Sequence, residues 1–468
     1  MSTFSGLNTA YTGLVAARQG LNVVAQNIAN ANTEGYTRQR VGTSSTGALT
    51  RTGLLTGGVQ IGQGVSVDAI ARLGDLHLDA RVRVAAGAAG YSSVRAGTMA
   101  GLEASLREPG ENGISAQLQE FWAAWQDLSN RPDDPAAGAV VLEEAGTLAA
   151  MVGRGYQDVA GQWARVRSDV GTMAADLNSA ASQVAGLNEK IRFAVANGGS
   201  ANELIDQRNQ LTTTIAALTG ATVRETGDGQ VDVLLGGNAL VAGSTAHSVR
   251  VSGPDTLGAG AGVQLEWASR QNTPLVLDGG KIAGALSMLG SAAGDGPLQA
   301  AAGNYNLFAE KLAGAVNGVY ADAPSNPDGT PRAFFTYTPG SAASSLQVIP
   351  AGSGELAAGA ADKGPLDGSI ADKVSQLGLG AQSPDKFWTD MVTGIGVAAR
   401  TELRQSELAD LASDSAQSMQ LSNASVDLDE ENVNLLSYQH AYQGAARVMT
   451  AVDEMLDTLI NRTGVVGR

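Results

Sequence analysis

The chain of 468 residues contains no cysteine, where average usage would supply roughly half a dozen. This absence excludes disulfide bonds, thiolate metal sites and cysteine nucleophiles. Aromatic residues make up only 4% of the chain, whereas glycine accounts for 60 residues. A chain with many turns and few aromatic anchors must obtain much of its cohesion from contacts between helices.

Positive charge is also scarce, because 30 lysines and arginines face 46 acidic residues and leave a net charge of −16. Nucleic-acid binding needs a basic face, and anionic membranes attract basic segments, so the composition argues against both partners. It describes instead an acidic protein long enough for two or three domains.

Apolar runs are short. None reaches the ~18 residues of a membrane-spanning helix without a glycine, asparagine or charged residue. The first residues, MSTFSGLNTAYTGLVAARQG, lack the basic and continuous apolar segments of a secretory signal peptide. Composition alone therefore indicates a cytoplasmic protein.

Known catalytic and metal-binding patterns are missing as well. His77, His247 and His440 lie in separate segments, and none has a second ligand at a metal-binding helical spacing. No nucleophile elbow, zincin, Walker or kinase pattern occurs, and the glycines of GGVQIGQG lack the frame of a nucleotide site. We therefore expect no enzymatic activity, no metal and no cofactor.

Clustered carboxylates offer the remaining candidates for chemistry. Asp133 and Asp134 are adjacent in sequence, which does not place two carboxylates across a cleft. The run DLDEE at 427–431 contains enough acids for a calcium site. A helix N-cap is the favoured interpretation, since Asp427 followed three residues later by Glu430 resembles a capping box and acids in a first turn complement the helix dipole.

What the sequence does contain is a heptad-spaced stripe at each end. Residues that repeat every 3.5 positions keep one side of a helix against a partner helix, so the first and last segments are predicted to pair with each other or with other subunits. The N-terminal stripe comprises Leu7, Tyr11, Leu14, Arg18, Leu21, Ala25 and Ile28. The C-terminal stripe comprises Leu428, Glu431, Leu435, Tyr438, Tyr442, Ala445, Met449, Val452, Leu456 and Leu459.

The middle of the chain predicts a bundle of long helices. Heptad stripes cover 114–128 and 159–194, and the second would span about 50 Å at ~1.5 Å per residue. Residues 221–267 instead alternate with period 2, which predicts a β-hairpin or small β unit. Further helices are expected over residues 73–106, 201–220, 280–320 and 384–419.

These patterns predict a mainly α-helical fold with a β insert and three parts. Residues 1–45 with 426–468 form a terminal coiled-coil domain. Residues 46–320 with 384–425 form a long-helix bundle domain that includes the β unit. Residues 321–383, rich in proline, glycine, serine and alanine, are expected to form a small, weakly cored outer β and loop insert.

Both terminal segments resemble the signatures of bacterial flagellar axial proteins. The segments are NIANANTEGYTRQRV at one end and VDLDEENVNLLSYQHAYQGAARVMTAVDEMLDTLINRTG at the other. With the internal ANELIDQRNQL, they are most similar to the hook-associated members of this family, which form the hook–filament junction. Glu34 stands where the family commonly has proline, which should only loosen that turn, and 321–383 is short for the family's outer domains.

The resemblance implies a structural, non-enzymatic subunit that is exported through the flagellar type III pathway without a cleaved signal peptide. Such proteins assemble outside the cell at the distal end of the hook. The implied partners are a ring of like subunits, the hook protein, the next hook-associated protein on the filament side and an export chaperone, with no nucleic acid and no membrane.

The resemblance also implies that the terminal helices pair as a coiled coil and complete their folding during assembly. A helix of about 30 residues with a narrow stripe is marginal alone, because isolated helices depend on tertiary partners. We expect the assembly interface to comprise Leu7, Tyr11, Leu14, Leu21, Ile28, Leu435, Tyr438, Tyr442, Met449, Val452, Leu456 and Leu459.

Two alternatives remain from sequence alone. Another axial subunit, from the hook or distal rod, would share the terminal segments, but the long helix at 159–194 and the ELIDQRNQL motif are not expected in those mostly β proteins. A flagellar wall hydrolase with axial ends would instead require a cleft lined with carboxylates.

Overall fold

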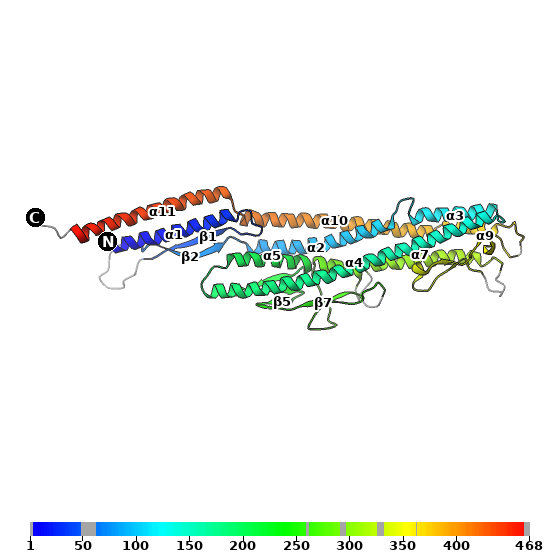
Figure 1. Cartoon of the computed structure of the whole chain (residues 1–468), viewed down its shortest axis with the longest axis horizontal. Coiled ribbons are helices and arrows are strands. Elements are labelled where there is room, and N and C mark those ends of the chain that lie inside the picture. Colours follow the sequence, from blue (N-terminus) through cyan, green and yellow to red (C-terminus); the bar gives the residue numbers. More distant parts are fainter. Residues whose placement is uncertain are drawn as a thin grey trace, which may run out of the picture.

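The computed structural model describes residues 3–47, 62–258, 262–290, 296–324, 332–361 and 363–462. Within these residues the chain forms a long helical rod, and one end of the rod carries a pair made of the first and last helices (Figure 1). The predicted mainly helical fold with paired terminal helices and a small β unit is therefore confirmed. Most of the glycine-rich stretch GGVQIGQG lies outside the described residues.

Nine helices of ten or more residues account for most of the described structure. The terminal pair consists of α1 (Thr3–Ala29) and α11 (Leu428–Asp457). The rod consists of α2 (Leu76–Leu106), α3 (Ile114–Asn130), α4 (Pro135–Ala196), α5 (Asn202–Thr219), α6 (Gly280–Leu289), α7 (Pro297–Tyr320) and α10 (Pro384–Ala424). Shorter helical turns are α8 (Ala342–Ser345), η1 (Ser353–Glu355), α9 (Ser369–Ser375), η2 (Gln376–Gly378) and η3 (Thr458–Arg462).

Helix α4 forms the spine of the rod. Its 62 residues span about 90 Å at ~1.5 Å per residue. The helix begins within the predicted break RPDDP, because Asp134 caps the first turn and Pro135 fits the N1 position. Among the described residues α4 is long and apolar enough to cross a membrane, but its buried face packs against α3, α5 and α7, as in the core helix of a bundle.

Glycines set two helix boundaries near the middle of the rod. Helix α5 ends where predicted, since Gly220 adopts the left-handed conformation with φ of 71°. The single helix expected over 280–320 is instead two helices, α6 and α7, separated near Gly290, where φ is 90°. Periodicity did not reveal this break, because the apolar pattern continues on both sides of it.

The strands form small antiparallel sheets. Strands β1 (Gln39–Ser45) and β2 (Val65–Arg72) form a two-stranded sheet against α1. In the predicted β unit, β4 (Val231–Leu235) buries alternate residues and packs within a four-stranded sheet beside α4. The remaining strands are β3 (Thr222–Glu225), β5 (Asn238–Ala242), β6 (Thr245–Ala246), β7 (Val249–Ser252), β8 (Gln264–Trp267), β9 (Phe335–Thr336) and β10 (Gln347–Val348).

An aromatic core fills the end of the rod that lies far from the terminal helices. Phe334 and Phe335 are fully buried there, and their rings lie 6.2 Å and 6.1 Å from the ring of Phe121. Trp125 lies 5.2 Å from Phe334 by ring centroids. The expectation of a weakly cored insert at 321–383 is therefore wrong, because this segment completes the core of α3, α4 and α7.

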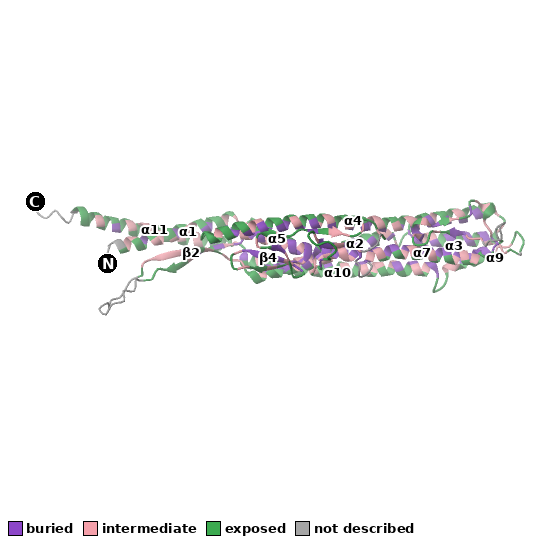
Figure 2. Ribbon diagram, turned by 90° about the horizontal axis from the view of Figure 1, so that it is seen from below, coloured by how far each residue is buried: buried purple, intermediate pink, exposed green. Residues whose placement is uncertain are grey.

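Burial differs sharply between the two parts of the molecule. Buried residues run through the middle of the rod, whereas the terminal pair is mostly exposed or half-buried (Figure 2). Two helices can cover each other on only one side, so most of the surface of α1 and α11 is left to solvent.

Candidate assembly site at the paired terminal helices

Helices α1 and α11 run antiparallel and meet along a regular seam. Each step of seven residues forward along α1 is matched by a step of seven residues backward along α11, which is the repeat of a coiled coil. The facing pairs are Gly6 and Val452, Gly13 and Ala445, Gly20 and Tyr438, and Asn27 and Glu431.

The α1 side of this seam is made of small residues. A methyl group placed on Gly6 or Gly13 would lie 3.9 Å from Val452 or 4.0 Å from Ala445, which is ordinary contact. At Gly20 the same methyl group would lie 2.5 Å from the ring of Tyr438. The seam is therefore tightest at Gly20, where only a glycine leaves room for the tyrosine ring.

The predicted N-terminal stripe is displaced from this seam by one position. The structure buries Ala10, Ala17, Gly20, Val24 and Asn27, each of which stands one position before a residue of the predicted stripe. The prediction weighted large apolar residues, whereas close helix packing selects small ones. A glycine at every seventh position, at 6, 13 and 20, was the signal that identifies the seam. Of the predicted residues, Leu7, Leu14, Leu21 and Ile28 are half-buried, and Tyr11 is 56% exposed.

The predicted C-terminal stripe contains the α11 residues that face α1. Val452 is buried, and Tyr438 faces Gly20. Tyr442 and Leu459 are exposed, so they lie at the margin of the pair. Glu431 is buried and Leu428 is exposed, whereas Leu435, Ala445, Met449 and Leu456 are half-buried.

A buried polar layer closes the seam at its rod end. Asn27 Nδ2 donates hydrogen bonds to Glu431 Oε2 at 3.1 Å and to the backbone oxygen of Gln39 at 2.9 Å. Tyr36 Oη and the Gln39 N–H both donate to Asn27 Oδ1, at 2.9 Å and 3.0 Å. Burial raises the pKa of Tyr36 to about 12, with smaller contributions from nearby carboxylates that include Glu431.

Arg38 completes this layer. Its Nε and Nη2 lie 2.8 Å and 2.7 Å from Glu431 Oε1, and its Nη1 lies 2.7 Å from Glu430 Oε2. The two segments that resemble flagellar axial signatures thus meet directly. Asn27, Tyr36 and Arg38 belong to NIANANTEGYTRQRV, and both glutamates belong to VDLDEENVNLL.

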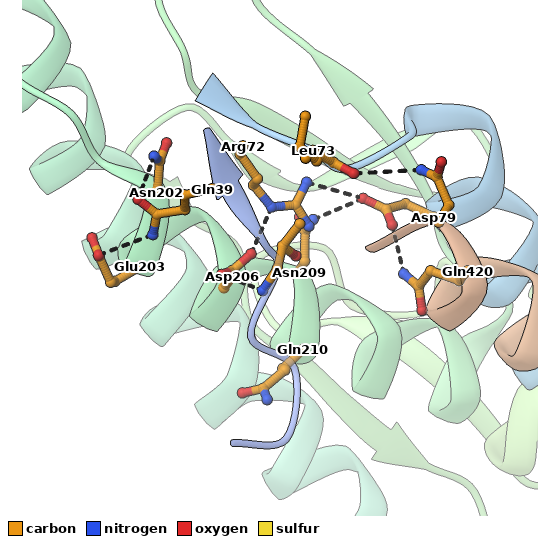
Figure 3. Close-up of polar contacts among 12 residues, drawn as sticks. Gln39, Arg72, Leu73, Asp79, Asn202, Glu203, Asp206, Asn209, Gln210 and Gln420 are labelled. Carbon is orange, nitrogen blue, oxygen red and sulfur yellow. Dashed lines mark hydrogen bonds and ion pairs between the residues drawn. The ribbon is translucent and has the colours of Figure 1, made fainter. Parts of the chain in front are cut away.

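A second polar cluster joins the terminal pair to the rod (Figure 3). Arg72, at the end of β2, pairs with Asp206 of α5 at 2.6 Å and with Asp79 of α2 at 3.6 Å. Asp206 also accepts a hydrogen bond from the Thr37 N–H at 3.0 Å, and Asp79 accepts one from Gln420 of α10. Three rod helices therefore hold the segments that lead to the terminal pair.

The internal motif ANELIDQRNQL supplies most of the α5 side of this cluster. Asn202 donates to Gln39 Oε1 at 3.1 Å, and Glu203 accepts from Gln39 Nε2 at the same distance. Gln210 donates to the backbone oxygen of Glu34 at 2.7 Å, beside Gly35, whose φ is 76°. The turn that carries Glu34 is therefore held by the rod.

The other candidate residues have structural roles or no assigned role. Asp427 caps α11, since its carboxylate accepts hydrogen bonds from the N–H groups of Asp429 and Glu430, as predicted. Within the described ranges, no group of three His, Asp or Glu residues is placed to hold a metal ion.

Comparisons with known proteins agree with this arrangement. A family model described as the flagellar hook-associated protein FlgK helical domain matches residues 99–335, which is just over half of the chain. A flagella basal body rod protein model matches residues 7–37, and a flagellar basal body rod FlgEFG protein C-terminal model matches 417–462. The last two cover both halves of the terminal pair.

Two relatives, one similar over its full length and one over part of it, have the same name. The flagellar hook-associated protein 1 of Bacillus subtilis is 27% identical over the whole of both chains. The protein of the same name from Salmonella typhimurium is 31% identical over 52% of this chain and 43% of its own. The solved structure of the flagellar hook junction protein FlgK from Burkholderia pseudomallei shares the fold, with a TM-score of 0.59 at 16% identity, over 72% of this chain and 99% of that one.

Proposed function

The chain belongs to the family of flagellar hook-associated proteins FlgK, and we propose that its paired terminal helices build it into the junction between hook and filament. Family membership makes the protein an extracellular structural subunit of the flagellum rather than an enzyme. The resemblance stated from the sequence is thereby confirmed.

The observation that carries this proposal is the seam of α1 and α11. Two helices from opposite ends of the chain bury one face of each and leave apolar side chains outside, among them Tyr11, Val433 and Leu436. A pair of two helices has little core of its own. Helices in proteins gain most of their stability from packing against other elements. Neighbouring subunits would supply the missing cover.

The assembly partners follow from the same premise. The protein is an axial component that assembles with other flagellar proteins. We propose that it forms a ring of like subunits, with the hook protein on one side and the next hook-associated protein on the other, and that an export chaperone binds it before secretion. Tyr11, Leu7 and Leu14 are the α1 residues proposed to contact a neighbour.

We also propose how the chain divides into domains. Residues 1–45 and 426–468 form the terminal domain, and residues 46–320 with 384–425 form the rod. Residues 321–383 are best grouped with the rod, because their phenylalanines share its aromatic core.

Two substitutions separate pairing from assembly. Val452→Asp places a charge in the seam, so it should open the pair in the isolated protein and block assembly. Tyr11→Asp alters an exposed side chain, so it should leave the pair closed and still block assembly. Val452→Ile is the matched control and should assemble normally. Pairing is read by hydrogen exchange of the α1 and α11 amides, and assembly by filament growth in cells carrying each variant.

Two outcomes would contradict the proposal. If Tyr11→Asp cells grow normal filaments, the outer face of α1 does not contact a neighbouring subunit. If cells lacking the gene keep their filaments and shed no flagellin monomers, the protein does not form the junction.

A further inference from the structure

We infer that Arg38 is the positioning residue that fixes the direction of the terminal helix pair relative to the rod. Three segments meet where the pair joins the rod: the turn before β1, the residues after β2, and the link between α10 and α11, of which the last two carry the chain across. Arg38 contacts all three, through its backbone and its side chain.

The backbone of Arg38 joins the other two connections. Its N–H donates to the oxygen of Ala424, the last residue of α10, at 2.9 Å. Its oxygen accepts from the N–H of Leu73, just after β2, at 2.9 Å. Asn423 Nδ2 lies 3.4 Å from the oxygen of Leu73, so each connection is hydrogen-bonded to both of the others.

The side chain of Arg38 then reaches the first turn of α11. It binds Glu430, whose side chain is 62% exposed, and Glu431, which is buried. A planar guanidinium holds two carboxylates at defined angles, whereas a lysine ammonium acts as a single point of charge. Bonds to two successive residues therefore fix the rotation of α11 as well as its position.

Packing beside these ion pairs is incomplete. A cavity of about 330 Å³ lies between α1, β1 and the start of α11, and Arg38, Glu431 and Asn434 are among the residues that line it. With space instead of side chains between these elements, the ion pairs of Arg38 are among the contacts that hold the start of α11 beside β1.

Arg40 offers a matched comparison two residues away. It is exposed, lines the same cavity, and its side chain makes no hydrogen bond or ion pair with any residue that the structure describes. A difference between substitutions at 38 and 40 therefore reports the contacts of Arg38 and not the loss of positive charge near α11.

The proposed function is needed only for the effect of this angle on assembly. Copies that form a ring must present their terminal pairs in one direction, so a variable angle would reduce the fraction of copies that fit. The angle itself is a property of the isolated protein.

The experiment measures that angle with spin labels, because the chain has no cysteine of its own to interfere. Labels at Gln405→Cys on α10 and Gln443→Cys on α11, both exposed positions, report the distance across the joint. Double electron–electron resonance should give one narrow distance distribution in the doubly labelled parent protein and in its Arg40→Ala variant. Arg38→Ala should widen it, about twofold or more, while the thermal unfolding of the rod stays unchanged. Arg38→Lys should restore part of the narrow distribution.

Three results would overturn the inference. A broad distribution in the parent protein, or an unchanged one in Arg38→Ala, means that Arg38 does not set the direction. If Arg38→Ala unfolds the rod and Arg38→Lys restores only stability and not the narrow distance, the residue is merely structural. Failure of the parent protein to assemble at a junction, with the spin-label result intact, would count against the proposed function alone.

Discussion

Asn27 donates a hydrogen bond of 3.1 Å to Glu431, a residue 404 positions away in the chain, and each of the two is only 1% exposed. Polar layers of this kind cost stability in a helix seam but specify its register. A slip of one heptad would bring Asn27 opposite Tyr438 and leave Glu431 without its partners. The seam can therefore close in one register.

Removal of Glu431 should open the pair. Glu431→Ala leaves Arg38 and Asn27 without their buried partner, and breaking such a pair costs about 3–5 kcal/mol. Hydrogen exchange should show loss of protection in α1 and α11 but not in α4. Glu430→Ala is the control, because its exposed ion pair is worth about 0–1 kcal/mol. Equal effects of the two substitutions would disprove the role of the buried layer.

A methyl group at Gly20 should also disrupt the pair. Gly20→Ala places that group 2.5 Å from the ring of Tyr438, and overpacking of this kind costs about 1–3 kcal/mol. Gly444→Ala, on α11, has no neighbour within 4 Å and should instead stabilise its helix by about 0.5–1 kcal/mol. Hydrogen exchange of α1 and α11 measures both, and a harmless Gly20→Ala would mean that the helices separate easily at this point.

Alkaline pH should weaken the same region. The pKa of Tyr36 rises from about 10 in the unfolded chain to about 12 in the folded one, so its contribution is full below pH 10 and is lost as the pH rises toward 12. The spin-label distance across the joint, followed between pH 9 and pH 12, should broaden in the parent protein. Tyr36→Phe cannot ionise, so its distance distribution, whatever its starting width, should change less over this range. An identical pH response would exclude Tyr36 as the cause.

The rod should respond to core substitutions as a separate unit. Trp125 is fully buried among Phe121, Tyr320 and Phe334, and Trp125→Ala should cost about 3–5 kcal/mol. Phe193→Ala, at a side chain 73% exposed on α4, should change stability by no more than about 0.5 kcal/mol. Thermal unfolding measures both, and a mild effect of Trp125→Ala would mean that this end of the rod is not a core.

Sequence patterns predicted the elements better than their contacts. The capping residue Asp427, the helix end at Gly220 and the register of the α11 stripe all follow from local chemistry, and each is confirmed. The α1 stripe was displaced by one position because hydrophobic periodicity gives no weight to glycine, although Gly20 makes the closest approach in the seam.

The joint could not be predicted for a different reason. Arg72, Asp79 and Asp206 come from three segments whose meeting depends on the path of the whole chain. Asp206 lies in the motif ANELIDQRNQL, but Arg72 and Asp79 have residue types of an ordinary exposed surface, so no local pattern shows that the three meet. The burial of Phe334 and Phe335 was missed for the same reason. Their proline- and glycine-rich surroundings predict a loop. The core that they enter is completed by Phe121 of α3, far earlier in the chain.

The antiparallel seam also makes the pairing of α1 depend on the presence of α11. Residues 6–27 precede every rod helix in the sequence, and their partners at 431–452 follow every one. A chain that stops before Glu431 still has every rod helix but lacks the helix that pairs with α1. Closure of the pair therefore requires that α11 is present, and copies truncated before Glu431 lack the paired helices from which assembly would start.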